Sequence, residues 1–139
     1  MHTYQLDKPD NLVDFLEESV KKYPDSKMIG TKNAAGEYVW ITYGELGRRV
    51  DNLRAGLAGL GVKRGDCVGI IANNRTEWVI CAYAAYGLGA RWVPMYEAEL
   101  TSVWKYIVAD SGIKVLLSPS RRSWKRSRIS PRTSRRSSS

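Results

Sequence analysis

Three short apolar runs, separated by two segments of helical length, constrain the fold of this chain more than any other feature. The runs are residues 67–72, 91–95 and 113–117, and the segments between them are residues 76–87 and 101–110. Each segment is long enough for about three helical turns but needs a packing partner to be stable. A strand that returns parallel to its predecessor needs a crossover of about a dozen residues. The pattern therefore predicts an α/β fold, mainly a parallel β-α-β-α-β unit whose sheet is covered on both faces.

The residues before this unit predict a capped helix followed by a hairpin. Asp10 stands where an N-cap would, apolar residues follow it at helical spacing, and Pro24 ends the helix. Residues 27–32 and 37–41 are the expected strands of the hairpin, and Gly36 in the turn between them can adopt the left-handed conformation.

A second amphipathic helix is predicted after the hairpin. Thr42 and Glu45 have the spacing of a capping box. An apolar stripe follows at steps of three and four residues, and Gly61 ends it. The stripe consists of Leu46, Val50, Leu53, Leu57 and Leu60. Farther along, Asn73-Asn74 leaves the first apolar run and is expected to cap the next helix, at the edge where open α/β sheets bind ligands.

The positive charge of the chain is concentrated at its C-terminal end. The formal net charge is +8, but residues 1–117 hold 14 basic and 14 acidic side chains and are neutral. Residues 118–139 hold nine Ser, seven Arg, Lys125 and no acidic residue. They contain too few apolar side chains to offset the conformational entropy of folding. We therefore expect a partial domain in residues 1–117 and a disordered tail in residues 118–139.

Cysteine usage and hydropathy favour a reduced protein without a membrane-spanning helix. Cys67 and Cys81 fall at apolar positions, which favours buried thiols over a disulfide. The N-terminal residues lack the basic and apolar regions of a secretory signal. The longest uncharged apolar stretch, residues 78–90, has 13 residues, fewer than the roughly 20 that span a bilayer. We expect a cytoplasmic protein, and a peripheral contact with an intracellular membrane stays open.

The sequence contains few of the residue patterns that are typical of catalytic sites. His2 is the only histidine and stands near a terminus, which argues against Ser-His-Asp and Cys-His catalysis. The carboxylates and thiols do not cluster with the spacing of a metal site. The glycines of residues 56–61 and 87–89 fit close packing or helix ends better than a dinucleotide fingerprint.

Three further groups have both a structural and a functional interpretation. Asn73, Asn74 and Arg75 could hold a phosphate at a helix N-terminus, although capping explains them as well. Glu97 and Glu99 could form an acid pair, although solvated loop carboxylates are commoner. Seven aromatic residues could form a stacking platform, but they lie inside the periodic elements and packing explains them better. They are Trp78, Tyr83, Tyr86, Trp92, Tyr96, Trp104 and Tyr106.

Several short motifs follow one another in a defined order along the chain. They are Trp40-Ile-Thr-Tyr43-Gly-Glu-Leu46, Gly56-Leu-Ala-Gly-Leu-Gly-Val62, Gly65-Asp66-Cys-Val68, Asn73-Asn-Arg-Thr-Glu77-Trp78, Gly89-Ala-Arg-Trp-Val-Pro94-Met-Tyr96 and Tyr106-Ile-Val-Ala-Asp110-Ser111. In this order they resemble the N-terminal part of an adenylate-forming, AMP-binding enzyme, and most closely a long-chain fatty acyl-CoA synthetase. The resemblance covers about residues 7–117.

The resemblance implies ATP-dependent, Mg-assisted activation of a fatty acid to an acyl-adenylate, followed by thioester formation with coenzyme A. In such enzymes the catalytic and nucleotide-binding motifs lie downstream of this region. They are a Ser/Thr/Gly-rich phosphate loop ending in Pro-Lys, a Tyr-Gly-x-Thr-Glu stretch, a ribose-binding Asp and a C-terminal lysine, and this chain contains none of these motifs. We therefore assign no catalytic, cofactor-binding or metal residue, and we expect this chain alone to bind none of these cofactors and to be inactive.

The pattern departs from the family at Ser118, and three explanations of the tail stay open. A change of reading frame or an unusual splice junction would explain its abrupt start. A genuine Ser/Arg-rich arm would bind nucleic acid or other polyanions through its eight positive charges. Phosphorylation of serines beside arginines would cancel that charge.

The alternatives to a ligase fragment follow from these explanations. One is a non-catalytic module whose basic tail binds polyanions, and another is a truncated form that interferes with a full-length synthetase. The sheet of the family needs further strands, so an uncovered strand edge and a marginally stable, aggregation-prone body are expected.

Overall fold

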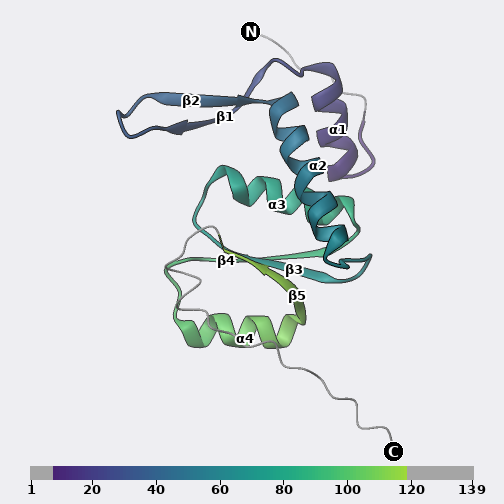
Figure 1. Ribbon diagram of the computed structural model, residues 1–139, viewed down its shortest axis with the longest axis vertical. Coiled ribbons are helices and arrows are strands. Elements are labelled where there is room, and N and C mark those ends of the chain that lie inside the picture. Colours follow the sequence, from purple (N-terminus) through teal and green to yellow (C-terminus); the bar gives the residue numbers. More distant parts are fainter. Residues whose placement is uncertain (1–7, 119–139) are drawn as a thin grey trace, which may run out of the picture.

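The computed structural model describes residues 8–118, and these residues form four helices and five strands (Figure 1). In chain order the elements are α1 (Leu12–Lys22), β1 (Lys27–Lys32), β2 (Tyr38–Thr42), α2 (Tyr43–Gly59), β3 (Cys67–Ile71), α3 (Thr76–Gly87), β4 (Arg91–Met95), α4 (Thr101–Ser111) and β5 (Ile113–Leu117). The predicted elements all occur. Their bounds shift by one residue in β2, in β3 and at the end of α4.

The parallel sheet has the predicted topology. Its strand order is β4-β3-β5, and β3 pairs in parallel with both neighbours. Helices α2 and α3 lie on one side of the sheet and α4 lies on the other (Figure 1). Every residue of β3 is buried, whereas β4 and β5 are only partly buried. The central position of β3, covered on both faces, explains why its sequence is continuously apolar.

Each face of the sheet supports its own core. On the α2 and α3 side, Val68 of β3 packs in a cluster with apolar side chains of both helices, including Val50 and Ile80. On the α4 side, Ile71 and Met95 pack around Trp104, whose side chain is 0% exposed. The large indole fills the space between α4 and the strands, and its burial is the main anchor of that helix.

Helix α1 begins one residue later than predicted. Its N-cap is Asn11, whose Oδ1 accepts hydrogen bonds from the backbone N–H groups of Val13 and Asp14 at 2.9 and 3.1 Å. Asp10 is exposed and precedes this cap. The prediction of Asp10 as the N-cap was wrong. Asp and Asn can both cap a helix, so the sequence alone did not distinguish Asp10 from Asn11.

Helix α2 confirms one half of the predicted capping box. Thr42 Oγ1 accepts the hydrogen bond of the Glu45 N–H at 3.2 Å, while the Glu45 carboxylate forms an ion pair with Arg49. Along the stripe, Leu46, Val50 and Leu57 are at most 1% exposed. Leu60 was wrongly included, because the helix ends at Gly59 and Leu60 is 67% exposed.

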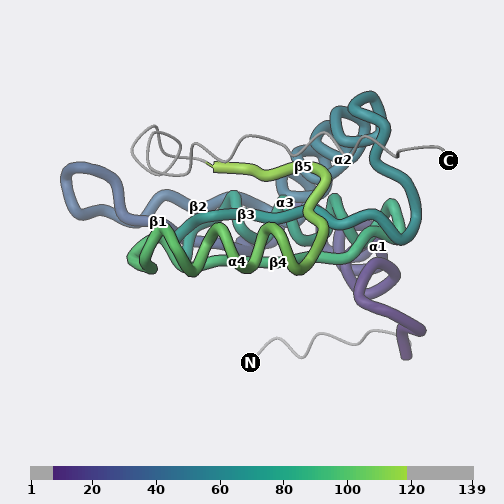
Figure 2. Tube along the Cα trace, turned by 90° about the horizontal axis from the view of Figure 1, so that it is seen from below, coloured from purple at the N-terminus to yellow at the C-terminus, as the bar shows by residue number. Residues whose placement is uncertain are grey.

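The β1–β2 hairpin forms a separate two-stranded antiparallel sheet. Gly36 adopts a φ of +81° in its turn, as predicted. Asn33 stabilises the turn because its Oδ1 accepts hydrogen bonds from the N–H groups of Ala35 and Glu37 at 2.9 and 3.0 Å. Figure 2 shows the hairpin extending beyond the helices and the parallel sheet.

Some predictions concern the ends of the chain. His2 and residues 119–139 lie outside the described residues, so the expected disorder of the tail stays a prediction. In residues 8–118, β4 and β5 each have only one neighbouring strand, which leaves one edge of each without a partner there. Among the described helices none has the length and hydropathy needed to cross a membrane.

Candidate functional site

The carboxyl ends of β3 and β4 form the edge at which the sequence predicts ligand binding. The backbone N–H of Ala72, the residue after β3, donates to the carbonyl of Met95, the last residue of β4, at 3.1 Å, so the strand pairing continues to the end of β4. The indole N–H of Trp104 donates to the carbonyl of Tyr96 at 2.9 Å. These bonds fix the places at which the loops leave the sheet.

Asn73 links the two loops at this edge instead of capping α3. Its Nδ2 donates to Glu97 Oε2 at 3.0 Å. The N-cap of α3 is Arg75, which has extended backbone angles and makes no side-chain capping bond. The prediction that Asn73 and Asn74 cap this helix was therefore wrong. Asn73 and Glu97 are 24 positions apart in the sequence, and sequence patterns, which report only local neighbours, therefore did not reveal their pairing.

Arg75, the cation of the phosphate hypothesis, already has a carboxylate partner. Its Nε and Nη2 donate to the two carboxylate oxygens of Glu77 at 2.7 and 3.1 Å. This bidentate pair lowers the pKa of Glu77 and raises the pKa of Arg75. Both groups therefore stay charged and neutralise each other at neutral pH. A phosphate that approached Arg75 would therefore meet the negative charge of Glu77.

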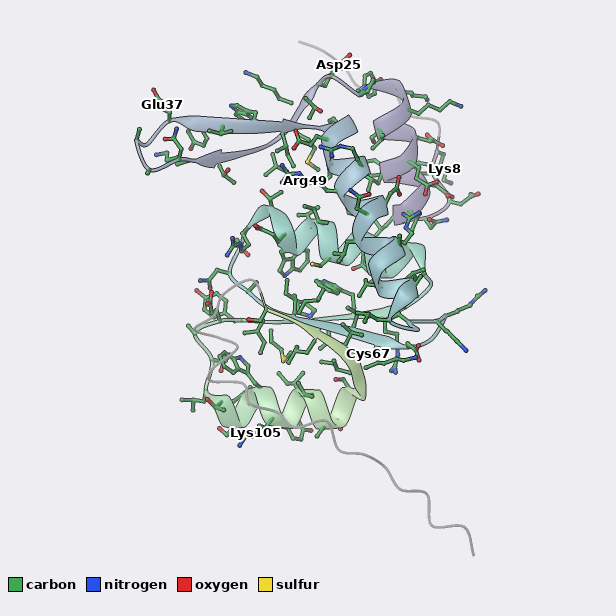
Figure 3. The ribbon with its side chains drawn as sticks, viewed as in Figure 1. Lys8, Asp25, Glu37, Arg49, Cys67 and Lys105 are labelled. Atoms are coloured by element: carbon green, nitrogen blue, oxygen red, sulfur yellow. The ribbon has the colours of Figure 1, made fainter. Side chains whose placement is uncertain are left out.

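A cleft of about 370 Å³ lies between the hairpin and the start of α3. Arg49 and Arg75 contribute its two cationic side chains, and Val39 and Ile41 contribute apolar ones. Figure 3 shows Arg49 on the side of α2 that faces this space. Arg49 forms its ion pair with Glu45, so each arginine in the cleft lies beside a carboxylate. Glu77 is the carboxylate that lines the cleft itself, and Glu45 pairs with Arg48 as well as with Arg49.

The remaining candidate carboxylates, Glu97 and Glu99, have different surroundings. Glu97 is partly buried and accepts the bond from Asn73, whereas Glu99 is exposed. Within residues 8–118, no group of three or more His, Cys, Asp or Glu side chains could hold a metal ion.

The aromatic residues serve mostly in packing, as predicted. Trp78 and Trp92 meet edge to face, with ring centroids 5.8 Å apart, and both pack against a buried cluster. Trp104 is fully buried. Tyr96 and Tyr106 are 59% and 69% exposed, so the packing interpretation was wrong for these two. Tyr96 directly follows the last residue of β4, Met95, and so lies outside the sheet.

The two cysteines are buried and form no disulfide. Burial raises the pKa of the Cys81 thiol to about 11, and the nearby Glu77 carboxylate adds to the shift. The thiolate is the nucleophilic form of cysteine. At neutral pH Cys81 is therefore a protonated core residue rather than a nucleophile.

Residues 61–66, just before β3, lie at the opposite end of the sheet, where the parallel strands begin; we call this end the amino edge. Gly61 and Gly65 adopt φ values of +82° and +85°, which favour glycine. Asp66 Oδ2 accepts hydrogen bonds from the Lys63 N–H and from Lys114 Nζ, each at 2.7 Å. The bond from Lys114 is the largest cause of the lowered pKa of Asp66. These positions therefore build the fold, and their spacing reflects the turn that starts β3.

Comparison with known proteins identifies the family. The family model described as AMP-binding enzyme matches residues 16–137. "Long chain acyl-CoA synthetase 2" of Arabidopsis thaliana is 31% identical over 106 residues, which cover 73% of this chain and 16% of that protein. "Long chain acyl-CoA synthetase 6, peroxisomal" of the same plant is 34% identical over 116 residues, which cover 79% of this chain and 16% of that protein.

Solved structures agree on the fold. The N-terminal domain of FACL13 from Mycobacterium tuberculosis matches with a TM-score of 0.75 at 24% identity, over 87% of this chain and 30% of that one. The chain spans 16% of the length of the two plant relatives, so it matches only a part of such proteins. The family match over residues 16–137 includes every element after α1 and the α1 residues from Leu16 onward. The chain therefore belongs to the AMP-binding enzyme family.

Proposed function

We propose that this chain is the N-terminal structural segment of an ATP-dependent long-chain fatty acid–CoA ligase, and that alone it catalyses no ligase reaction. The observation that carries the proposal is that the shared motif residues have structural roles. Asp66 joins the turn before β3 to Lys114 of β5, and Thr42 caps α2. The identity of 34% to a plant long-chain acyl-CoA synthetase supports the substrate class.

The surroundings of two candidate reactive groups among the described residues support the proposed inactivity. Arg75 and Glu77 neutralise each other, and the Cys81 thiol stays protonated because its pKa is about 11. The family reaction needs ATP, Mg²⁺ and coenzyme A, and the motifs that the resemblance implies for binding them are missing from the printed sequence. In this proposal the segment positions neighbouring parts of a ligase rather than the substrates themselves.

Fatty-acid-dependent exchange of pyrophosphate with ATP tests the inactivity of the chain. The chain would be incubated with ATP, Mg²⁺ and palmitate, beside a full-length long-chain acyl-CoA synthetase as positive control. We expect no exchange above the protein-free blank. Exchange that depends on both the chain and palmitate would overturn the proposal of inactivity.

A chimera tests the structural role. The segment of the peroxisomal plant relative that aligns with this chain would be replaced by residues 16–117, and ligase activity would be measured. We expect activity to survive, and to be lost when Trp104→Ala is added, because that indole is fully buried. A soluble, folded chimera without activity would argue against this role.

The charge of residues 118–139 favours a second candidate function, binding of polyanions. These residues hold eight basic side chains and no acidic ones, which predicts salt-dependent affinity for nucleic acid. Deletion of residues 118–139 should abolish retention on heparin at low salt. Unchanged retention after the deletion would contradict polyanion binding by residues 118–139.

A further inference from the structure

The β1–β2 hairpin carries three exposed large apolar side chains in a row. Tyr38, Val39 and Trp40 are consecutive residues of β2 and are 60%, 53% and 44% exposed. The hairpin projects away from the helices and from the parallel sheet in both views (Figures 1 and 2). The rings of Tyr38 and Trp40 are therefore largely uncovered within residues 8–118.

The strand register places two aromatic rings on one face of this hairpin. Tyr38 pairs with Lys32 and Trp40 pairs with Gly30. The two ring centroids are 6.0 Å apart. Trp40 lies flat over Gly30, where an added Cβ would come within 2.9 Å of the indole. Glycine at this position therefore lets the indole lie close against the backbone of β1.

Two lysines complete this surface, which we call the aromatic–lysine face (Lys27, Lys32, Tyr38 and Trp40). The Nζ of Lys27 lies 5.6 Å from the centroid of Trp40, and the Nζ of Lys32 lies 5.4 Å from that of Tyr38. All four side chains are exposed. The only acidic residue between positions 27 and 42 is Glu37, and its carboxylate accepts a bond from Asn33 in the turn. The face is therefore cationic and amphipathic.

We propose that the aromatic–lysine face docks the protein on the headgroup region of an anionic lipid bilayer. Tyrosine and tryptophan rings prefer the membrane–water interface, since each has an apolar body and one polar atom. Lysines close to the bilayer surface are attracted by anionic lipids. The hairpin therefore presents rings that suit the membrane–water interface together with ammonium groups that suit the anionic headgroups. This inference does not depend on the ligase proposal, because its test measures binding and no catalysis.

Single-stranded nucleic acid fits the same face less well. Base recognition by stacking needs open aromatic faces and a cationic track along the backbone. Here each ring already has a lysine ammonium over it, at 5.6 and 5.4 Å. The face also carries only two lysines, which make a short track. Insertion into the headgroup layer requires no stacking and leaves the lysine–ring contacts in place.

Sedimentation with lipid vesicles tests the proposal on the full chain. Vesicles of phosphatidylcholine would be compared with vesicles that also contain phosphatidylglycerol. The test variant is Lys27→Glu with Lys32→Glu, and the matched control is Lys8→Glu with Lys105→Glu. Both double variants change the net charge equally, and Figure 3 shows Lys8 and Lys105 far from the hairpin. The basic tail is identical in both, so a difference between them reports the position of the lysines.

We expect the hairpin variant to lower partitioning onto anionic vesicles by roughly tenfold or more, and the control to lower it much less. Equal losses in the two variants would overturn the proposal and assign binding to overall charge. Far-UV circular dichroism of each variant checks that the fold is kept, which both double variants should satisfy because all four lysines are exposed.

A second pair of variants tests how much the aromatic rings contribute to vesicle binding. Tyr38→Ser removes an exposed ring from the aromatic–lysine face, and Tyr106→Ser removes one of similar exposure from α4, at 60% and 69%. We expect only Tyr38→Ser to weaken vesicle binding, by several-fold. If the hairpin variants lose binding to a single-stranded oligonucleotide but keep vesicle binding, nucleic acid replaces the membrane as the partner and the proposal is wrong.

Discussion

The amino and carboxyl edges of the parallel sheet are held in different ways. At the amino edge, Asp66 in the turn before β3 pairs with Lys114 of β5, and Lys114 Nζ also donates to the Gly61 carbonyl at 2.6 Å. At the carboxyl edge, the contacts include the buried Trp104 indole and the hydrogen bond of Asn73 with Glu97 near the surface. We therefore expect the turns and the ion pair to stabilise the amino edge, and the buried indole to stabilise the carboxyl edge much more than the Asn73–Glu97 bond does.

The largest expected effect comes from the core residue of the carboxyl edge. Trp104→Ala removes a fully buried indole and its hydrogen bond to the Tyr96 carbonyl. The free energy of unfolding should fall by about 3–5 kcal/mol, the usual range for a buried Trp→Ala change. Chemical denaturation followed by circular dichroism measures it. Because the body is predicted to be marginally stable, this variant should be largely unfolded without denaturant.

Trp104→Phe is the matched control for this variant. It keeps an aromatic ring in the core but removes the N–H that donates to Tyr96, so it should cost clearly less than Trp104→Ala. Equal losses would assign the whole effect to the hydrogen bond. A sharp, cooperative melt of the unsubstituted monomer at high temperature would contradict the predicted marginal stability.

Most of the fold could be predicted from the sequence, because its signals are local. Apolar runs of strand length, the spacing in α2 and the glycine at position 36 each report on the nearest few residues. The errors arose where two residues compete for one role or where the partner is distant in sequence. Asp10 and Asn11 are equally good caps, and Asn73 was assigned to a local cap while its partner Glu97 lies one crossover away.

The amino edge should respond to a change of backbone conformation. Gly65→Ala places a Cβ on a residue with a φ of +85° and nothing within 4 Å, so only the backbone strain is tested. The free energy of unfolding should fall by about 1–2 kcal/mol. Gly56→Ala is the matched control, since it too has open space but lies inside α2, where alanine is preferred by up to about 1 kcal/mol. Equal effects of the two changes would contradict the structural role of the turn.

A smaller effect is expected from the charge at the same edge. Asp66→Asn weakens the contact with Lys114, and the denaturation midpoint should fall at neutral pH. Since the folded-state pKa of Asp66 is lowered, its stabilisation is present above the unfolded pKa of about 3.9. That stabilisation is lost as the pH falls through the folded value. The midpoints of the two proteins should therefore converge in acid. A difference that persists at low pH would mean that the ion pair is not its cause.

The smallest effect should come from the exposed pair at the carboxyl edge. Asn73→Ala removes the 3.0 Å bond to Glu97, but both loops stay anchored by the Ala72–Met95 and Trp104–Tyr96 bonds. The free energy of unfolding should therefore change by no more than about 0.5 kcal/mol, as for most surface substitutions. Asn74→Ala, the same change at the exposed neighbour, sets the background in the same denaturation experiment. A loss for Asn73→Ala as large as that for Gly65→Ala would show that the carboxyl edge depends on its surface pair. The division of structural duty between the two edges would then be wrong, and Asn73 would count as a residue of the fold and not as one left free for a ligand.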